Sequence, residues 1–353
     1  MRIRNILVFF ILFTFNNCKD LYDFKVVRTN NNLVVNGIIS NADGPDILKL
    51  GTTAILEKEP DPLTGALVSV VDQNGNREYY EDLGEGKYKL NGNTVIGSVN
   101  DIYTLEIKLP DGREYRSTPE KMPSPHAKDT AYFKVEKEEI VSGEGVPVKT
   151  YKVNIYLTTQ FPKTPDAAYI RWGIDEVYLI IPTCAPGAIE CPDYCYIYQE
   201  VSKYNLKIVN TSNYNELPIK DLLLQSRAVD FTFMQRHAFN ITQYAMNQGA
   251  YDYWKNVELL TERTGSIFDT PPAALQGNIH NVDDPSEQVF GYFEASATAI
   301  IRVFVDRGYI PSDTDVTNCG WDFRYRPSGN PYPYCTSCGA IKGSTNTMPD
   351  WFF

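Results

Sequence analysis

Hydrophobic and polar residues alternate with a period of two over short segments of the first third of the chain. The alternation is clearest in Gly86–Leu90 and Tyr103–Ile107, and it is typical of strands with one buried face. Asn74-Gly75 lies between two such segments and is a strong signal for a two-residue hairpin turn. The regular spacing of strands and turns predicts an immunoglobulin-like or transthyretin-like β-sandwich over residues 33–122.

Longer strand patterns occupy residues 123–353, after a proline-rich boundary at residues 119–125. Residues 151–157 alternate as expected of a half-buried antiparallel strand, and residues 169–181 form another long strand segment. These patterns predict a second, larger antiparallel β domain. It ends in a cysteine-rich tail over residues 306–353.

One segment of this second domain has the periodicity of a helix, with five apolar residues at i, i+3, i+4 spacing: Ala250, Tyr253, Trp254, Val257 and Leu260. Gly265 follows as a residue that favours the end of a helix. The pattern therefore predicts one main helix at residues 248–264, with an aromatic face that packs on the sheet. The fold class is thus mostly β.

Residues 1–17 have the layout of a secretory signal peptide. A basic start at Arg2 and Arg4 precedes an apolar stretch, Ile6–Phe15, that is too short to span a membrane. Cys18 follows closely and is predicted to be the lipid-attachment residue of a bacterial lipoprotein, held to a membrane by acyl chains. Residues 18–32 are polar and unpatterned, and we expect them to form a tether.

The lipidation site departs from the usual pattern. Phe15 and Asn17 stand where a Leu-like residue and a small residue are common, so an ordinary signal peptide with an incidental cysteine is the alternative. We favour lipidation because the apolar stretch ends abruptly and Cys18 lies where cleavage is expected. Lys19 and Asp20 resemble a signal for export of lipoproteins to the cell surface, which predicts surface display.

Composition narrows the function classes. The formal net charge of -11 argues against nucleic-acid binding and against electrostatic adhesion to anionic lipid. Hydrophobic residues make up 43% and charged residues 22% of the 353 residues, which is a normal globular balance. The 24 Tyr and 17 Phe favour strands, and they also offer stacking surfaces for sugars or peptides.

Six cysteines remain after Cys18, in two clusters: Cys184, Cys191, Cys195, Cys319, Cys335 and Cys338. Because an exported chain meets an oxidising compartment, we expect them to form three disulfides of undetermined pairing. The alternative is a structural zinc site that uses Cys335-Thr-Ser-Cys338. Disulfides would pin the tail, so we expect the tail to fold back and bury Trp351 against the second domain.

No catalytic or cofactor-binding motif is recognisable. His126, His237 and His280 lie outside metal-binding spacings, and the chain lacks a nucleophile elbow and a phosphate-binding glycine loop. We therefore predict a protein that is not an enzyme, with no cofactor and no resident metal.

Two acidic segments raise the possibility of calcium binding. Asp72-x-Asn74-x-Asn76 begins like a calcium loop but has Arg77 where glycine is needed, so a hairpin turn explains it better. The acidic run at residues 283–287 is expected to be a solvated loop, with calcium as the alternative.

A distinctive block spans Thr264–Asp269, Pro271-Pro272, Gly277-Asn278-Ile279 and Gly291–Ser296. With this block, the chain resembles domain-of-unknown-function family 4249 over essentially its whole mature length. The residues that carry the resemblance are Tyr253, Trp254, Gly265, Phe268, Gly277, Asn278, Gly291, Tyr292, Phe293 and Trp351.

The resemblance implies a location and a kind of partner, and it identifies no catalytic residue. Members of the family look like outer-membrane lipoproteins of Bacteroidota that occur beside TonB-dependent transporters. This implies an accessory subunit that holds or gates cargo for such a barrel. The alternative is a structural or assembly subunit of an outer-membrane complex without cargo.

The Gly277-Asn278-Ile279 turn also has a structural interpretation. Gly277 would supply unusual backbone angles and the Asn278 amide would satisfy backbone groups of the loop. The alternative interpretation is a loop that contacts a partner.

Overall fold

The computed structural model describes most of the chain after the tether, in these ranges: residues 31–53, 60–124, 128–141, 147–161, 168–181, 194–200, 206–211, 218–261, 275–314, 338, 341 and 343–353. Within them the protein is mostly β, with one α-helix and two short 3-10 helices, η2 (Phe231–Phe233) and η3 (Arg307–Tyr309). None of the described helices is long and apolar enough to cross a membrane.

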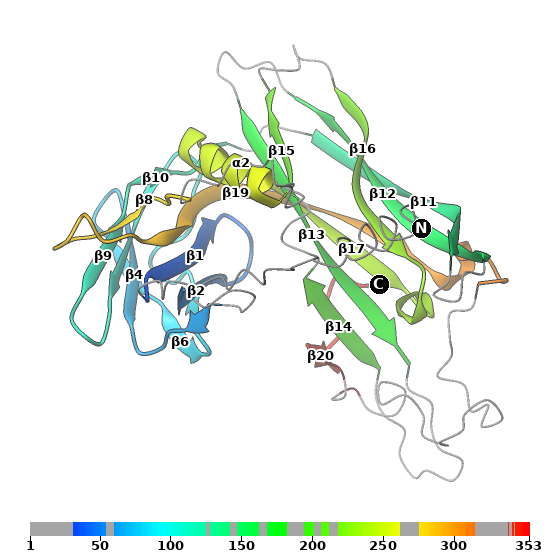
Figure 1. The fold of residues 1–353 in the computed structure, drawn as a ribbon, viewed down its shortest axis with the longest axis horizontal. Helices are drawn as coiled ribbons and strands as arrows, with labels where there is room; N and C mark the ends of the chain where they lie inside the picture. The colour runs from blue at the N-terminus through cyan, green and yellow to red at the C-terminus, as the bar shows by residue number, and fades with distance from the viewer. Residues whose placement is uncertain are drawn as a thin grey trace, which may run out of the picture.

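The first lobe is a sandwich of two sheets, seen at the left of Figure 1. One layer is the end of the largest sheet, made of β1 (Leu33–Ser40), β2 (Asp46–Thr52), β3 (Asp61–Pro62), β6 (Glu81–Gly84) and β7 (Lys87–Leu90). The other layer contains β4 (Leu67–Asp72), β5 (Arg77–Tyr79), β8 (Ile102–Lys108), β9 (Glu114–Ser117), β10 (Glu120–Lys121) and β18 (Ile279–Asn281).

The period-two pattern forms the core of this sandwich. Tyr88 and Leu90 on β7 are buried, as are Tyr103, Leu105 and Ile107 on β8, and all five belong to one hydrophobic cluster. Alternate side chains of a strand point to opposite faces, so each strand buries one set and exposes the other. A β-sandwich therefore forms here, and β18 and the first half of β19, from the later part of the chain, belong to it.

The second lobe is also built from two layers. A three-stranded sheet consists of β11 (Lys128–Val141), β12 (Pro147–Gln160) and β16 (Ile219–Ala228). It packs on the other half of the largest sheet, made of β13 (Tyr169–Ile180), β14 (Cys195–Glu200), β15 (Lys207–Asn210), β17 (His237–Met246), β19 (Phe290–Val305) and β20 (Ser344–Thr345). Trp172, Phe233 and Phe239 are among the largest side chains buried between the layers.

Strand β19 belongs to both lobes (Figure 1). Its first half pairs in parallel with β1, from Val34 opposite Phe290 to Ser40 opposite Ser296. Its second half pairs antiparallel with β17, from Ala245 opposite Ala297 to His237 opposite Val305. One continuous sheet therefore runs from the first sandwich into the second.

Helix α2 (Gln248–Thr261) lies across this sheet and contacts β13, β15, β17 and β19. Asn247 Oδ1 accepts a 2.8 Å hydrogen bond from the Ala250 N–H, which caps the first turn. Tyr251 stacks on Tyr169 with ring centroids 4.6 Å apart. The start of the predicted helix and its packing on the sheet are confirmed, and the predicted end at residues 262–264 lies outside the described residues.

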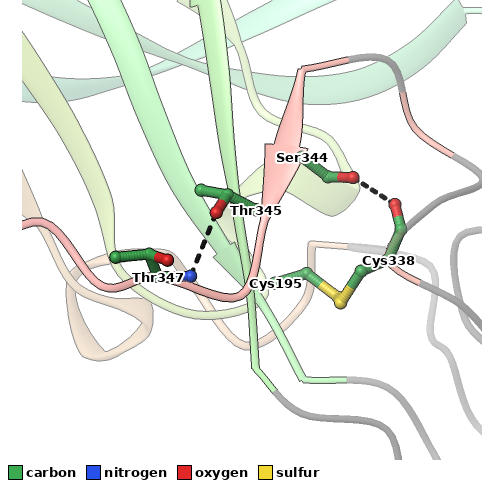
Figure 2. The surroundings of a disulfide bond; sticks show 5 residues. All are labelled: Cys195, Cys338, Ser344, Thr345 and Thr347. Carbon is green, nitrogen blue, oxygen red and sulfur yellow. Dashed lines mark hydrogen bonds between the residues drawn. A yellow bond between two sulfur atoms is a disulfide. The ribbon is translucent and has the colours of Figure 1, made fainter.

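A disulfide joins Cys195 on β14 to Cys338 in the tail, with Cα atoms 5.3 Å apart (Figure 2). The bond lies beside β20, which pairs antiparallel with β14. Because Cys338 is in this bond, it is not a ligand of the zinc site considered from the sequence. The other cysteines of the three expected disulfides lie outside the described residues: Cys184, Cys191, Cys319 and Cys335.

The tail folds back as expected, but the residue that it buries is Phe352 and not Trp351. Phe352 is 0% exposed in a cluster with Val177, Leu179 and Tyr196, whereas Trp351 is half-buried. The Arg236 guanidinium donates a 2.9 Å hydrogen bond to the Phe352 carbonyl oxygen. The backbone at the end of the chain is thus held where Phe352 points into the sheet.

We predict that Phe352→Ala lowers the free energy of unfolding by about 3–5 kcal/mol, because it leaves a cavity under the tail. The matched control is Phe353→Ala, since Phe353 is 70% exposed. Chemical denaturation of the purified protein measures both changes. Equal stability of the two variants would show that the tail is not docked.

Candidate functional site

An open groove of about 1140 Å³ lies on the face of the large sheet that points away from the three-stranded sheet. Side chains alternate along β13, β17 and β19, so that Trp172, Phe239 and Val303 enter the core of the second lobe. Their neighbours point the other way and form the floor of the groove: Arg171, Gly173, Asp175, Asn240, Thr242, Tyr244, Ile300 and Arg302.

Strand register arranges this floor in rows. Gly173 pairs with Thr242, which pairs with Ile300. Asp175 pairs with Asn240, which pairs with Arg302. Because Gly173 has no side chain, the groove floor is lower at its position than at the neighbouring residues. A Cβ added at Gly173 would lie 3.3 Å from the Tyr244 ring.

One end of the groove is closed by an ordered polar cluster on Arg171. The guanidinium lies 3.8 Å from the Tyr244 ring centre and 4.6 Å from that of Trp254 on α2. It pairs at 3.0 Å with Glu294, which is 2% exposed and also accepts a 2.7 Å hydrogen bond from Trp254 Nε1. Removing one partner of such a buried pair costs about 3–5 kcal/mol, so this wall is rigid.

The opposite end of the groove is formed by the tail. Asp350 and Trp351 line it, and the Arg302 guanidinium lies 4.5 Å from the centre of the Trp351 ring. Cation–π contact of this kind favours one placement of both side chains. The docked tail is therefore part of the site.

A second hollow of about 650 Å³ shares floor residues with the groove and reaches the β1–β2 turn. Asp46 lines it and accepts hydrogen bonds from Ser40 N at 2.9 Å and Ser40 Oγ at 2.8 Å. Desolvation by burial raises the pKa of the Asp46 carboxyl to about 6, against these two hydrogen bonds, which lower it. Asn41 Oδ1 accepts from the Thr298 N–H at 2.7 Å, which docks the same turn on β19.

Several of the sequence-predicted motif residues meet behind α2, around Glu120 on β10. Its carboxylate accepts hydrogen bonds from Asn278 Nδ2 at 2.9 Å, from the Tyr292 hydroxyl at 3.0 Å and from Asn247 Nδ2. Burial raises the pKa of Glu120, while these hydrogen bonds lower it. The hub connects the first sandwich, the start of α2 and β19.

Asn278 and the two glycines of the motif serve the backbone. Asn278 Oδ1 accepts from the Phe293 N–H at 2.9 Å and its Nδ2 donates to the Phe293 carbonyl at 2.8 Å, so the amide satisfies backbone groups of β19 and not those of its own loop. A Cβ on Gly277 would lie 1.6 Å from the Gly291 oxygen, and one on Gly291 would lie 1.7 Å from the Val35 oxygen. Gly277 is thus required by close approach and not by a positive φ, whereas Gly291 has φ +88°.

The other motif residues lie in the cores, at the groove or outside the described residues. Tyr253 packs on Tyr292 with centroids 4.9 Å apart, and Phe293 is 0% exposed in the first core. Trp254 and Trp351 line opposite ends of the groove. Gly265, Phe268 and the lipidation candidate Cys18 lie outside the described residues.

The histidines do not form a site together. His237 is fully buried between the rings of Phe233 and Phe239. His280 is exposed on β18, and His126 lies outside the described residues. Within the ranges given above, no group of three or more His, Cys, Asp or Glu side chains is placed to hold a metal ion.

The two acidic segments are turns in this structure. Asp72 Oδ1 accepts from the Asn74 and Asn76 N–H groups at 2.8 and 2.9 Å, which closes the hairpin between β4 and β5. In the later segment Glu287 pairs with Arg113 at 3.0 Å and accepts from the Tyr115 hydroxyl at 2.8 Å. The hairpin turn predicted for the first segment fits this geometry. In the second segment residues 283–286 are exposed, as expected of a solvated loop, whereas Glu287 is partly buried.

The sequence analysis did not identify the groove floor or the ion pair between Arg171 and Glu294. Arg171 and Glu294 lie far apart in the chain, and only their occurrence inside apolar strand segments marks them as unusual. A charged residue in an otherwise buried strand needs a partner of opposite charge. Its presence in such a strand is the sequence signal that points to a buried ion pair.

The comparison with family models identifies the protein family. The model of the domain of unknown function DUF4249 matches residues 19–302, which include β1, the Glu120 hub, α2 and most of β19. The chain belongs to the DUF4249 family. The DUF4249 match begins one residue after Cys18 and covers all the floor residues of the groove.

Other comparisons add little to the DUF4249 assignment. A solved structure titled "Biofilm associated protein - BSP domain" aligns at 8% identity and a TM-score of 0.15, over 77% of this chain and 59% of that one. The chain thus spans less than two thirds of that structure. No curated protein matches the sequence significantly.

The pKa of Asp46 gives a prediction of pH dependence. A folded pKa of about 6 against the ordinary 3.8 means that the folded state binds the proton more tightly than the unfolded chain. Its contribution to stability is therefore full below pH 3.8 and lost as the pH rises through 6. Asp46→Asn should raise the free energy of unfolding at pH 7.5 by about 1–3 kcal/mol, with the gain fading toward pH 4.

Urea unfolding at several pH values measures this difference. Asp43→Asn is the control for the change in net charge, because Asp43 is an exposed residue of the same turn. If Asp46→Asn destabilised the protein equally at pH 7.5 and pH 4, the raised pKa of Asp46 would be contradicted.

Proposed function

We propose that this chain is a lipid-anchored, surface-exposed outer-membrane protein that holds cargo for a TonB-dependent transporter and catalyses no reaction. In this proposal the acyl chains are carried by Cys18 and residues 18–32 form the tether. The groove on the continuous sheet is the cargo site.

The observation that carries the proposal is the groove itself. Binding sites are concave surfaces that exist before the ligand arrives and are built on rigid elements. Here the floor consists of paired strands β13, β17 and β19, and both ends are fixed, by the Arg171 cluster and by the docked tail. The groove is open to solvent, which suits the temporary holding of a large cargo. For an enzyme we would expect a more enclosed pocket.

The chemistry of the groove supports binding in preference to catalysis. Glu294 is engaged with Arg171 and Trp254, and Ser296 Oγ donates to its second oxygen. A carboxylate held by three partners acts as a fixed structural charge and is poorly placed to exchange protons with a substrate. The partner and the surface location rest on the leader sequence and on the family resemblance.

A structural subunit without cargo is the second candidate, and one observation favours it. Leu67, Tyr79 and Val282 are 54%, 54% and 45% exposed and line a hollow on the first sandwich together with charged residues of β5, β8 and β9. Neighbouring exposed apolar side chains of this kind fit a lasting contact with another protein.

Copurification from native membranes separates the two functions. An affinity tag is inserted after Asn74, in the exposed β4–β5 turn, which contributes no residue to the groove or the tail. We expect the tagged chain to recover an outer-membrane barrel with a plug domain. The matched control, Cys18→Ala, should accumulate as an unlipidated soluble form and recover much less of the barrel.

Recovery of a biogenesis complex, with no barrel of this kind, would favour the structural subunit. If Cys18→Ala remains with the outer membrane after high salt and after detergent removal of partners, lipidation is not the anchor.

A further inference from the structure

We propose that the groove binds an extended oligopeptide that is neutral or basic and carries aliphatic side chains. The inference rests on the proposed function, since it names the cargo class of the same groove.

Exposed aliphatic side chains lie in the groove. Ile300 is 46% exposed and Ile47 is 36% exposed, and both line the groove together with Ile38. Covering such side chains is favourable in proportion to the apolar area removed from water. Aliphatic groups on the ligand would cover them without leaving a polar atom unpaired.

The aromatic rings of the groove argue against a carbohydrate. A sugar-binding platform needs a free ring face, but Tyr244 and Trp254 are both in contact with the Arg171 guanidinium. The Trp351 ring is in the same kind of contact with Arg302. These three rings thus hold arginines in place. Tyr198 on β14 is a groove ring outside these contacts and is 47% exposed, so it is on the floor itself that the exposed apolar contact is aliphatic.

The floor has the repeat of an extended chain. Side chains on one face of a strand recur at every second residue, about 6.6 Å apart. The rows at Tyr244, Thr242 and Asn240 follow this spacing along β17. An extended peptide that lies along the strands has the same repeat, so its side chains meet successive rows.

Polar groups for the peptide backbone are also present. Asn36 on β1 is exposed in the groove, and a primary amide offers both a donor and an acceptor to a peptide group.

Size and charge define the ligand further. The groove of about 1140 Å³ continues into the hollow of about 650 Å³, and together they exceed what a single small metabolite fills. Glu294 is neutralised by Arg171, and Glu176 is 2% exposed and pairs with Arg227. The other charged residues of the lining are the exposed Asp43, Asp175 and Asp350 and the basic Lys49 and Arg302, and the chain as a whole carries a net charge of -11. This field favours a neutral or basic peptide over an acidic one.

The test uses fluorescence anisotropy with the purified mature protein and a labelled pentapeptide, Lys-Ile-Ala-Ile-Lys. Replacement of its terminal lysines by glutamate should weaken binding about tenfold, and replacement of its isoleucines by glycine should do the same. Ile300→Ser should raise the Kd for the lysine peptide about tenfold. The matched control is Ile96→Ser, because Ile96 is 65% exposed and lies outside the groove.

Asn36→Ala is a second groove variant at an exposed position, and thermal melting checks that all variants are folded. The proposal is overturned if the peptide does not bind saturably, if Ile300→Ser and Asn36→Ala both bind as the wild type does, or if cellohexaose displaces the peptide. Copurification of the barrel is scored separately with Ile300→Ser. Retained barrel with lost peptide binding supports the peptide groove, whereas peptide binding without any barrel overturns only the transporter assignment.

Discussion

The double pairing of β19 is the constraint on which the rest of the structure depends. This strand of 16 residues offers one edge to β1 in its first half and the other edge to β17 in its second half. Its buried side chains follow the same division, with Phe293 and Ala295 in the first core and Val303 and Val305 in the second. Neither sandwich is complete without it, and the groove floor exists because the sheet continues from one lobe to the other.

The sequence block on which the family resemblance was based stabilises this pairing. Gly291 lets β19 approach the Val35 backbone, and Gly277 lets the preceding segment approach Gly291. Asn278 then satisfies both backbone groups of Phe293, and Tyr292 joins Asn278 at Glu120. These residues hold three stretches of backbone at close range, so their distinctive spacing reflects a folding requirement more than a ligand site.

Much of the fold follows from local pattern, because strand and helix periodicities are properties of neighbouring residues. The alternation at Tyr103–Ile107 and the stripe from Ala250 to Leu260 both predicted their elements. The parallel pairing of β1 with β19 left no local trace, since it joins segments separated by most of the chain. Only a contact between remote segments brings Arg171 to Glu294, and the same holds for Cys195 and Cys338.

The tail shows where prediction from residue type alone is insufficient. The cysteines near the end of the chain predict a docked tail, with Trp351 as its buried residue. The direction of each side chain depends on the backbone that Arg236 and the Cys195–Cys338 bond hold in place. In that arrangement Phe352 points inward, and Trp351 is left to cover Arg302 at the end of the groove.

Hydrogen exchange of the native protein tests most directly whether β19 makes the two lobes one body. Backbone amides of β19 that pair with β1 and those that pair with β17 should exchange together, at the rate of global unfolding. The amides of Val35–Ile39 and Phe239–Thr242 should share that rate. Fast exchange confined to the β1–β19 pairs, with β17 still protected, would show that the lobes open separately and that the groove floor is not one rigid sheet.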